Sequence, residues 1–292
     1  MAFNIQTFKT RSLTAAIFVV VMLAGLLLNY FSFFLLFTVI HFGCWLEYQK
    51  LIGLIDEDYK QITPFHKYGV MILGWGFMLY MAHPSIGIGN LTLHEIGWWL
   101  MVVFALALPI AEILFSKQLN VKLIGYSLTG LLYISLSWGL MIDIRNKGMV
   151  DGDSIFHYDF GWIYPIVLIA SIWINDTMAY IVGSFIGKTP FSSISPKKTW
   201  EGTLGGAILA IAAVTLLGYF AFGMKDYTSL IVISSIAAVI GTAGDLLESK
   251  LKRMANVKDS GHIMPGHGGF LDRFDSLILA TPFVWFYITF FA

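Results

Sequence analysis

Two pairs of acidic residues near the C-terminus have a spacing that suits chemistry on charged substrates. Asp245 and Glu248 are three residues apart, and so are Asp272 and Asp275. An i,i+3 spacing places both side chains on the same face of a helix. Hard divalent cations favour oxygen ligands, and Mg²⁺ commonly takes one or two carboxylates while phosphates and water complete its shell. The two pairs therefore predict a metal or phosphate site.

The segment between the two pairs is basic and rich in glycine. Glycine lets backbone N–H groups approach a phosphate closely, and Lys and Arg neutralise its charge. The residues expected to contact phosphate here are Lys252, Arg253, Lys258, His267, Gly268 and Gly269. His267 is either an acid/base group or a turn residue that donates a hydrogen bond. Asp245 and Glu248 also fit a simpler role, as an exposed helix end paired with one of the lysines at 250 and 252.

A second basic loop precedes a stretch of small residues at 203–207, which favours close helix packing. Its lysines fit a segment that attracts anionic lipid headgroups, at about 1 kcal/mol each. That interpretation leaves Glu201 and the nearby membrane residue Asp176 unexplained, so we expect substrate binding instead. The candidate residues are Ser195, Lys197, Lys198, Glu201 and Asp176.

The composition sets the environment in which these groups work. Of 292 residues, 57% are hydrophobic and 12% charged, against roughly 25% charged in a soluble domain. The mean hydropathy of +0.75 and the long apolar runs exclude a soluble enzyme, a disordered chain and a disulfide-stapled secreted domain. A formal net charge of +0 excludes a generally basic nucleic-acid binder, so no nucleic-acid partner is expected.

The apolar runs predict an all-α, polytopic integral membrane protein with about nine transmembrane helices, because the bilayer offers backbone groups no partner. The expected spans are 12–28, 30–47, 68–82, 96–115, 121–142, 161–183, 202–222, 228–248 and 271–291. With the N-terminus in the cytoplasm, 15 of the 18 Lys and Arg residues fall on the inner side, and only Arg145, Lys147 and Lys225 on the outer side. Cytoplasmic loops retain such residues, so this division predicts the orientation.

Ionisable groups inside spans are costly and concentrate in the C-terminal half. We therefore divide the chain into an N-terminal membrane region at 1–150, with about five spans, and a C-terminal catalytic region at 151–292, with about four spans. The active site is expected at the cytoplasmic face. Glu112 stands alone in another span, where a structural hydrogen bond is expected.

The charged positions of the C-terminal region resemble a known family signature, that of the phosphatidate cytidylyltransferases, or CDP-diacylglycerol synthases. The resemblance rests on order and spacing over about the last 130 residues. Met264 is a conservative departure from it. The matching positions are Ser249, Lys252, Arg253, Lys258, Asp259, Gly261, Pro265, His267, Gly268, Gly269, Asp272, Arg273 and Asp275, with further likeness in the segment 195–202 and in Asp176-x-x-Ala179-Tyr180.

The resemblance implies that CTP and phosphatidic acid give CDP-diacylglycerol and pyrophosphate, with Mg²⁺ required. It implies catalytic roles for Asp245, Asp272, Asp275, Lys258 and His267, Mg²⁺ ligation by Asp245, Glu248, Asp272 and Asp275, and substrate contacts that include Arg273. A bacterial cell (cytoplasmic) membrane is the expected location, and a homodimer is suggested by the resemblance alone.

Two other classes of protein compete with this reading. A secondary transporter also places charges in broken helices, but its site lies near the bilayer midplane, whereas these charges gather at one face. A lipid kinase or a CDP-alcohol phosphotransferase would also use Mg²⁺ and a basic face. Their products, a phosphorylated alcohol or a phosphodiester, differ from a liponucleotide.

Overall fold

The computed structural model describes residues 5–115, 120–148, 160–262 and 268–292. Its long helices are α1 (Ile5–Leu27), α2 (Tyr30–Ile55), α3 (Pro64–Tyr80), α4 (Leu93–Phe115), α5 (Val121–Gly130), α6 (Leu136–Asn146), α7 (Ile163–Ile186), α8 (Trp200–Leu216), α9 (Tyr227–Met254) and α10 (Leu271–Phe291). Three short helices complete them: the 3₁₀ helix η1 (Glu57–Gln61), the π-helical η2 (Leu131–Ser135), which joins α5 to α6, and the π-helical η3 (Leu217–Ala221), which extends α8.

The membrane character predicted from composition is confirmed. Within the described residues, seven helices are long and apolar enough to cross a membrane: α2, α4, α5 through α6, α7, α8 through η3, α9 and α10. The count of nine spans stays a prediction, because the apolar part of α1 covers only Ser12–Leu27 and α3 has 17 residues.

Helix boundaries follow local sequence signals. Asn29, which alone separates the first two apolar runs, caps α2, because its Oδ1 accepts from Ser32 N at 2.9 Å while Asn29 N donates to Ser32 Oγ at 3.1 Å. Thr63 caps α3, because its Oγ1 accepts from His66 N at 3.1 Å, and Pro64 occupies the first helical position, where no N–H is needed. The span expected at 68–82 therefore begins four residues earlier.

Two local features differ from the sequence-based prediction. The all-α chain carries one small hairpin, in which β1 (Gly87–Ile88) pairs with β2 (Leu91–Thr92). Arg145, counted above as a charge on the outer side, is 1% exposed in the last turn of α6. Its guanidinium carbon lies 5.8 and 5.7 Å from the ring centres of Tyr30 and Phe33, so two aromatic rings lie beside this buried cation.

The chain divides into two compact units. The first comprises Met1–Asn146 and Met254–Arg273, and the second comprises Lys147–Arg253 and Phe274–Ala292. The segment Met254–Arg273, which sequence reasoning grouped with the C-terminal region, thus packs with the N-terminal half. The boundary drawn at residue 150 lies outside the described residues.

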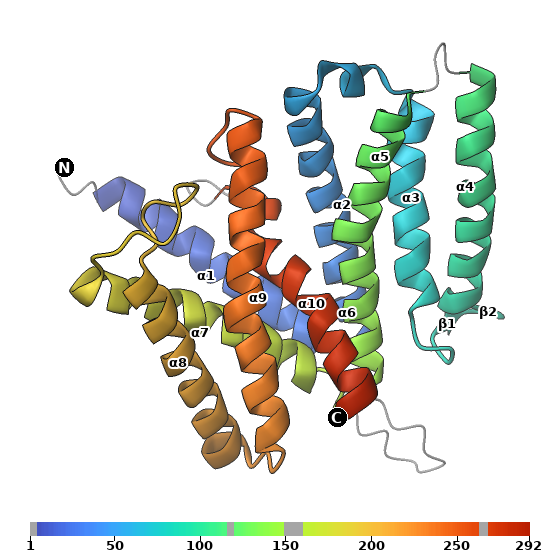
Figure 1. Ribbon diagram of the computed structural model, residues 1–292. Helices are drawn as coiled ribbons and strands as arrows, with labels where there is room; N and C mark the ends of the chain where they lie inside the picture. The colour runs from blue at the N-terminus through green and yellow to red at the C-terminus, as the bar shows by residue number, and fades with distance from the viewer. Residues whose placement is uncertain (1–4, 116–119, 149–159, 263–267) are drawn as a thin grey trace. The chain divides into compact units, whose positions relative to one another are not determined.

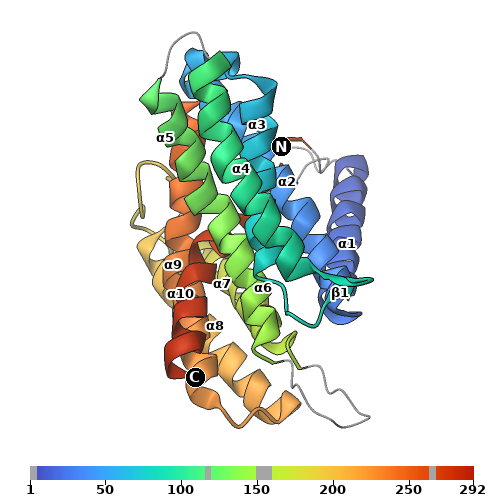
Figure 2. The ribbon, with the colours of Figure 1, turned by 90° about the vertical axis from the view of Figure 1, so that its right-hand side faces the viewer.

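The first unit is a bundle in which α2, α3, α4 and the α5 to α6 rod run side by side (Figures 1 and 2). Its core is aromatic, with Trp45 and Trp138 completely buried. Trp45 Nε1 donates to Ser135 Oγ at 2.8 Å, and His41 Nε2 lies 3.0 Å from the same oxygen. Ser135 ends the π-helical turn, so this irregularity presents a hydroxyl to two buried polar rings.

In the second unit, α7 and α8 pack closely against each other at glycine residues, as the small residues at 203–207 predict. A Cβ added at Gly206 would lie 2.6 Å from Ala179 N, and one at Gly202 would lie 2.8 Å from Ala179 O. Real Cβ atoms do not approach backbone this closely, so only glycine permits the observed separation. This packing fixes the start of α8, and with it the basic loop that precedes the helix.

We predict that Gly206→Val destabilises the protein by about 1–3 kcal/mol more than Gly125→Val does. Both changes alter the helix propensity equally, but a Cβ at Gly125 meets nothing within 4 Å. Thermal unfolding of each variant in detergent, followed by tryptophan fluorescence, measures the difference. Equal midpoints for the two variants would mean that α7 and α8 tolerate a wider separation.

Candidate active site

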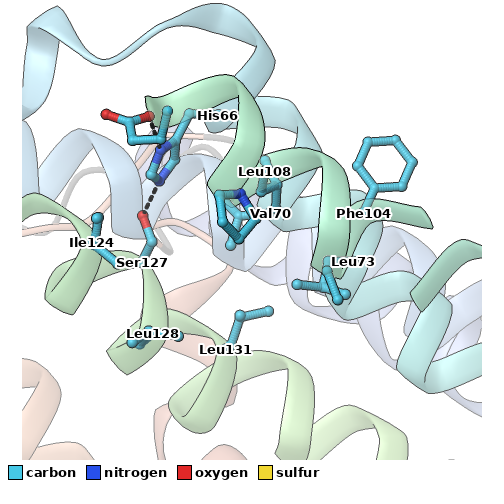
Figure 3. Close-up of a pocket in the computed structure, with 12 residues that line it drawn as sticks. His66, Val70, Leu73, Phe104, Leu108, Ile124, Ser127, Leu128 and Leu131 are labelled. Atoms are coloured by element: carbon cyan, nitrogen blue, oxygen red, sulfur yellow. Dashed lines mark hydrogen bonds and ion pairs between the residues drawn. The ribbon is translucent and has the colours of Figure 1, made fainter. Parts of the chain in front are cut away.

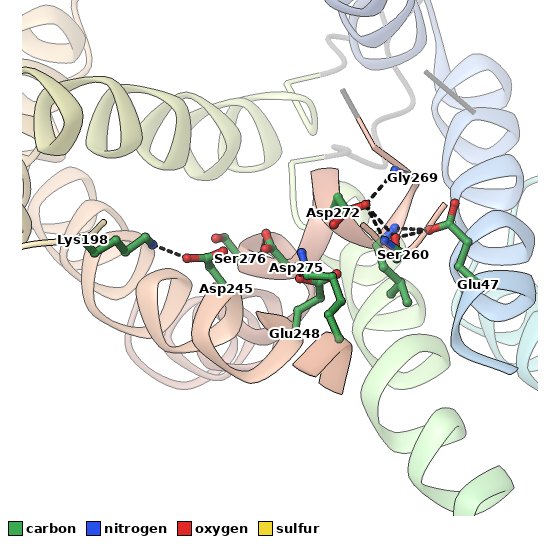
Figure 4. A network of polar contacts seen from close by, with 11 residues as sticks. Glu47, Lys198, Asp245, Glu248, Ser260, Gly269, Asp272, Asp275 and Ser276 are labelled. Atoms are coloured by element: carbon green, nitrogen blue, oxygen red, sulfur yellow. Dashed lines mark hydrogen bonds and ion pairs between the residues drawn. The ribbon is translucent and has the colours of Figure 1, made fainter. Parts of the chain in front are cut away.

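A cluster of carboxylates forms in the second unit, where α9 meets α10. A Cβ at Gly244 would lie only 2.5 Å from the backbone oxygen of Asp275, so the two helices touch at this glycine. The contact places the carboxyl group of Asp245, the next residue, within hydrogen-bonding reach of Asp275, and Glu248 is close enough to act on Asp275 electrostatically. Three of the four predicted ligands therefore gather here (Figure 4).

These carboxylates are withdrawn from solvent to different degrees. Glu248 is 0% exposed and Asp275 8%, whereas the Asp245 side chain keeps 25% of its surface accessible. Buried charges need close partners, because desolvation costs several kcal/mol per ion. Asp245 Oδ2 forms an ion pair with Lys198 Nζ, and Glu248 Oε2 lies 2.5 Å from Lys252 Nζ, one turn further along α9. The ion pair of Glu248 with Lys252 is one of the alternatives that the sequence analysis left open.

The donor set suits Mg²⁺ only in part. Among the residues that the structure describes, no three His, Cys, Asp or Glu side chains converge as a complete metal site. Asp245 and Asp275 nevertheless offer adjacent carboxylates at the end of an apolar helix pair. Mg²⁺ commonly takes one or two carboxylates and completes its shell with substrate phosphates and water, so this pair is the part of the donor set that suits it.

The basic loop before α8 is held by its own glutamate. Glu201 Oε2 accepts from Lys188 N and Thr189 N, each at 3.1 Å, and Oε1 accepts from Thr189 Oγ1 at 2.8 Å. The cap of α8 at Thr199, whose Oγ1 accepts from Gly202 N at 3.1 Å, fixes the other side of the loop. The result aims Lys198 at Asp245, while its neighbour Lys197 is exposed.

Asp272 makes a separate set of contacts, within the first unit. Its Oδ2 accepts from Gly269 N at 2.8 Å and from both the N and the Oγ of Ser260, each at 2.9 Å. Gly268 is required beside it, because its φ is +81° and an added Cβ would lie 2.6 Å from Asp272 Oδ2. Asp272 thus folds the glycine-rich segment back onto the first turn of α10.

Glu47, on α2, is a participant that sequence reasoning missed. Its carboxylate accepts from Ser260 Oγ at 2.6 Å, Phe270 N at 2.9 Å and Leu271 N at 2.9 Å (Figure 4). An acidic side chain from another helix therefore satisfies backbone donors at the N-terminus of α10, where helices favour negative charge. Its position within an apolar run was the only available signal, since the partners are more than 200 residues away.

The remaining predicted residues that the structure describes lie at separate positions and do not form one cluster. Asp176 is exposed on α7, one turn before the Ala179 contact with α8. Ser195 lies in the basic loop, where its carbonyl accepts from Lys198 N at 3.1 Å. The exposed cations on either side of the glycine-rich segment are Arg253, Lys258 and Arg273. His267 lies outside the described residues.

Comparisons with known proteins agree with the family resemblance found in the sequence. The family model described as "Cytidylyltransferase family" matches residues 9–291. A phosphatidate cytidylyltransferase of Bacillus subtilis is 33% identical over 224 residues, which cover 76% of this chain and 78% of that protein. Proteins of the same name from Staphylococcus saprophyticus and Haemophilus influenzae are 29% and 28% identical, each over 94% of this chain and 96% of their own length.

The resemblance found in about the last 130 residues thus extends through both units. The N-terminal helices, which carry few charges, lie within the same family match. Because the family model matches nearly the whole length of the chain, the chain belongs to the cytidylyltransferase family.

Proposed function

We propose that this protein is a phosphatidate cytidylyltransferase, which transfers CMP from CTP to phosphatidic acid and releases pyrophosphate. The carboxylate cluster of α9 and α10, with Lys198 paired to Asp245, is the observation that carries the proposal. Family membership and the names of the relatives support it. Phosphatidic acid reaches the site from the bilayer in which the apolar helices lie, while CTP arrives from water.

The proposed reaction is an in-line attack by a phosphate oxygen of phosphatidic acid on the α-phosphorus of CTP. The attacking oxygen is already ionised, so catalysis consists mainly of positioning two anions and neutralising charge in the transition state. Lys198, Arg253 and Lys258 are proposed to bind phosphates. Glu201 is proposed to act indirectly, by shaping the loop that carries Lys198.

Asp245 and Asp275 are the proposed Mg²⁺ ligands, with Glu248 and Asp272 as further candidates. Bound Mg²⁺ would neutralise phosphate charge and polarise the phosphorus–oxygen bonds. Lys198 compensates the charge of Asp245. If the Lys198 ammonium group moved from Asp245 to a phosphate of CTP, the Asp245 carboxylate would become available to Mg²⁺. Substrate binding would then favour metal binding.

We also propose that the N-terminus and the active site face the cytoplasm of a bacterial cell. The uneven distribution of Lys and Arg supports this orientation. Burial of Arg145 strengthens it, because one of the three cations assigned to the outer side is not a loop charge. A homodimer stays a prediction.

The function is tested by giving purified, detergent-solubilised protein labelled CTP and phosphatidic acid, with Mg²⁺ present or chelated. We expect a labelled liponucleotide only when lipid and metal are both present. In the same assay, Asp275→Asn should lower turnover by at least about 10²-fold, comparable to the loss of a group that stabilises transition-state charge. Asp58→Asn, an exposed change in η1, is the matched control and should retain turnover.

A phosphorylated alcohol or a phosphodiester as product would identify a different lipid phosphotransferase. Transport of a labelled solute into vesicles without any product would identify a transporter. Full turnover by folded Asp275→Asn protein would remove this residue from the proposed metal site.

Lys198→Ala is expected to weaken CTP binding or slow turnover more than Lys197→Ala does. Lys198 reaches the carboxylate cluster, whereas Lys197 is exposed on the same loop. Initial rates against CTP and phosphatidic acid concentrations separate the two effects. Equal kinetics for both variants, with weaker binding to anionic vesicles, would favour the lipid-headgroup role of the loop.

Glu47→Gln should lower turnover without greatly changing the KM for CTP, because Glu47 holds the start of α10 rather than substrate. An amide places its NH₂ group against donors that the carboxylate accepts from, and an unsatisfied buried donor costs about 1–3 kcal/mol. Glu57→Gln, on the exposed 3₁₀ helix η1, is the control. A raised KM with unchanged kcat would instead indicate direct contact with CTP.

A further inference from the structure

The first unit contains an apolar cavity that the cytidylyltransferase proposal does not use. It has a volume of about 290 Å³ and lies among α3, α4, α5 and η2 (Figure 3). This volume is at the small end of the ligand-pocket range, roughly 300–1,000 Å³. Its apolar lining includes Val70, Leu73, Phe104, Leu108, Leu128 and Leu131. Such a lining suits a single hydrocarbon chain.

Three polar side chains also line this cavity, and they form a chain of hydrogen bonds. Ser127 Oγ lies 2.8 Å from His66 Nε2, and His66 Nδ1 lies 3.0 Å from Glu112 Oε2. Figure 3 shows the His66 ring directed at Ser127. The structural hydrogen bond expected at Glu112 is thus confirmed, but its partner is an imidazole that also reaches a serine.

The order of these groups is the one that activates a serine. A nucleophilic hydroxyl requires a base within hydrogen-bonding distance, and a third group that orients the base. Here the three residues come from three helices, α5, α3 and α4. In the tautomer that donates from Nδ1 to Glu112, Nε2 of His66 accepts the hydrogen bond of the Ser127 hydroxyl.

Tyr59 supplies a fourth group at the same serine. Its hydroxyl lies 3.3 Å from Ser127 Oγ, and the residue is 2% exposed. Burial raises the pKa of Tyr59, so its hydroxyl stays protonated and remains a donor at neutral pH. A tyrosine hydroxyl next to a nucleophile is one of the groups that stabilise a developing oxyanion.

We propose that Ser127, His66 and Glu112 form a second catalytic site, which cleaves a carboxylic ester whose acyl chain occupies the apolar cavity. Ser127 Oγ attacks the ester carbonyl carbon, and its proton passes to His66 Nε2. The bond from carbonyl carbon to alcohol oxygen then breaks, and His66 returns the proton to the departing alcohol. Water attacks the acyl-serine by the same route, releasing a carboxylic acid and restoring Ser127.

A purely structural role for the three residues makes a different prediction. A buried network that only joins α3, α4 and α5 needs neither a reactive hydroxyl nor an adjoining cavity. Reactivity of Ser127 toward a serine-directed reagent therefore separates the two roles. Long and short alkyl chains on that reagent test the cavity.

The experiment treats the purified full-length protein in detergent with a fluorescent alkyl fluorophosphonate, and maps the modified residue by mass spectrometry. We expect the label on Ser127 of the unaltered protein, with faster reaction for a long alkyl chain than for a methyl group. Because the site is mapped on unaltered protein, the result does not depend on the folding of a variant. No label, or a label on another residue, overturns the proposal.

Variants then test the roles of the three side chains. Ser127→Ala should lose the label, whereas Ser137→Ala should keep it, because Ser137 is equally buried but donates to its own helix at Tyr133 O. His66→Gln and Glu112→Gln should each slow labelling at least about tenfold, as expected for a base and the group that orients it. Undiminished labelling of either variant, with an unchanged thermal midpoint, contradicts the assigned role.

Discussion

The contact of α9 with α10 at Gly244 is the constraint on which the carboxylate cluster depends. Side chains near a membrane surface need neighbouring helices to hold them, because water and headgroups compete for every charge. At Gly244 the two backbones approach until no Cβ fits, and Asp245 is thereby set beside Asp275. Two carboxylates in this position repel each other, so the arrangement is satisfied by a cation. Lys198 pairs with Asp245 in this position.

Many of the helices can be predicted from the sequence, because a bilayer permits few backbone structures. Long apolar runs have few alternatives to helix, and a single polar residue, Asn29, suffices to separate two of them through a capping box. Small residues after Thr199 predict the close packing that Gly202 and Gly206 make with α7. The i,i+3 spacing of Asp245 and Glu248 predicts that both lie on one face of α9, because periodicity within one helix is a local property.

Other features depend on contacts that local patterns do not encode. Glu47 is one acid in an apolar run, and nothing near it in sequence reveals that its partners are Ser260 and the start of α10. The sequence places Arg145 among the loop cations, yet it is buried beside the rings of Tyr30 and Phe33. Asp272 and Asp275 look equivalent by spacing, but one carboxylate holds backbone donors while the other faces Asp245.

The hydrogen bonds of Glu47 to the start of α10 also make the late helices depend on the early ones. The signature-bearing segment at 254–273 belongs to the unit built by the N-terminal helices. A gene fragment encoding only the later helices would keep most of the charged positions, but its tenth helix would begin without an acceptor for Phe270 and Leu271. The early helices therefore contribute an acceptor that the start of α10 needs, and a fragment without them lacks part of the fold.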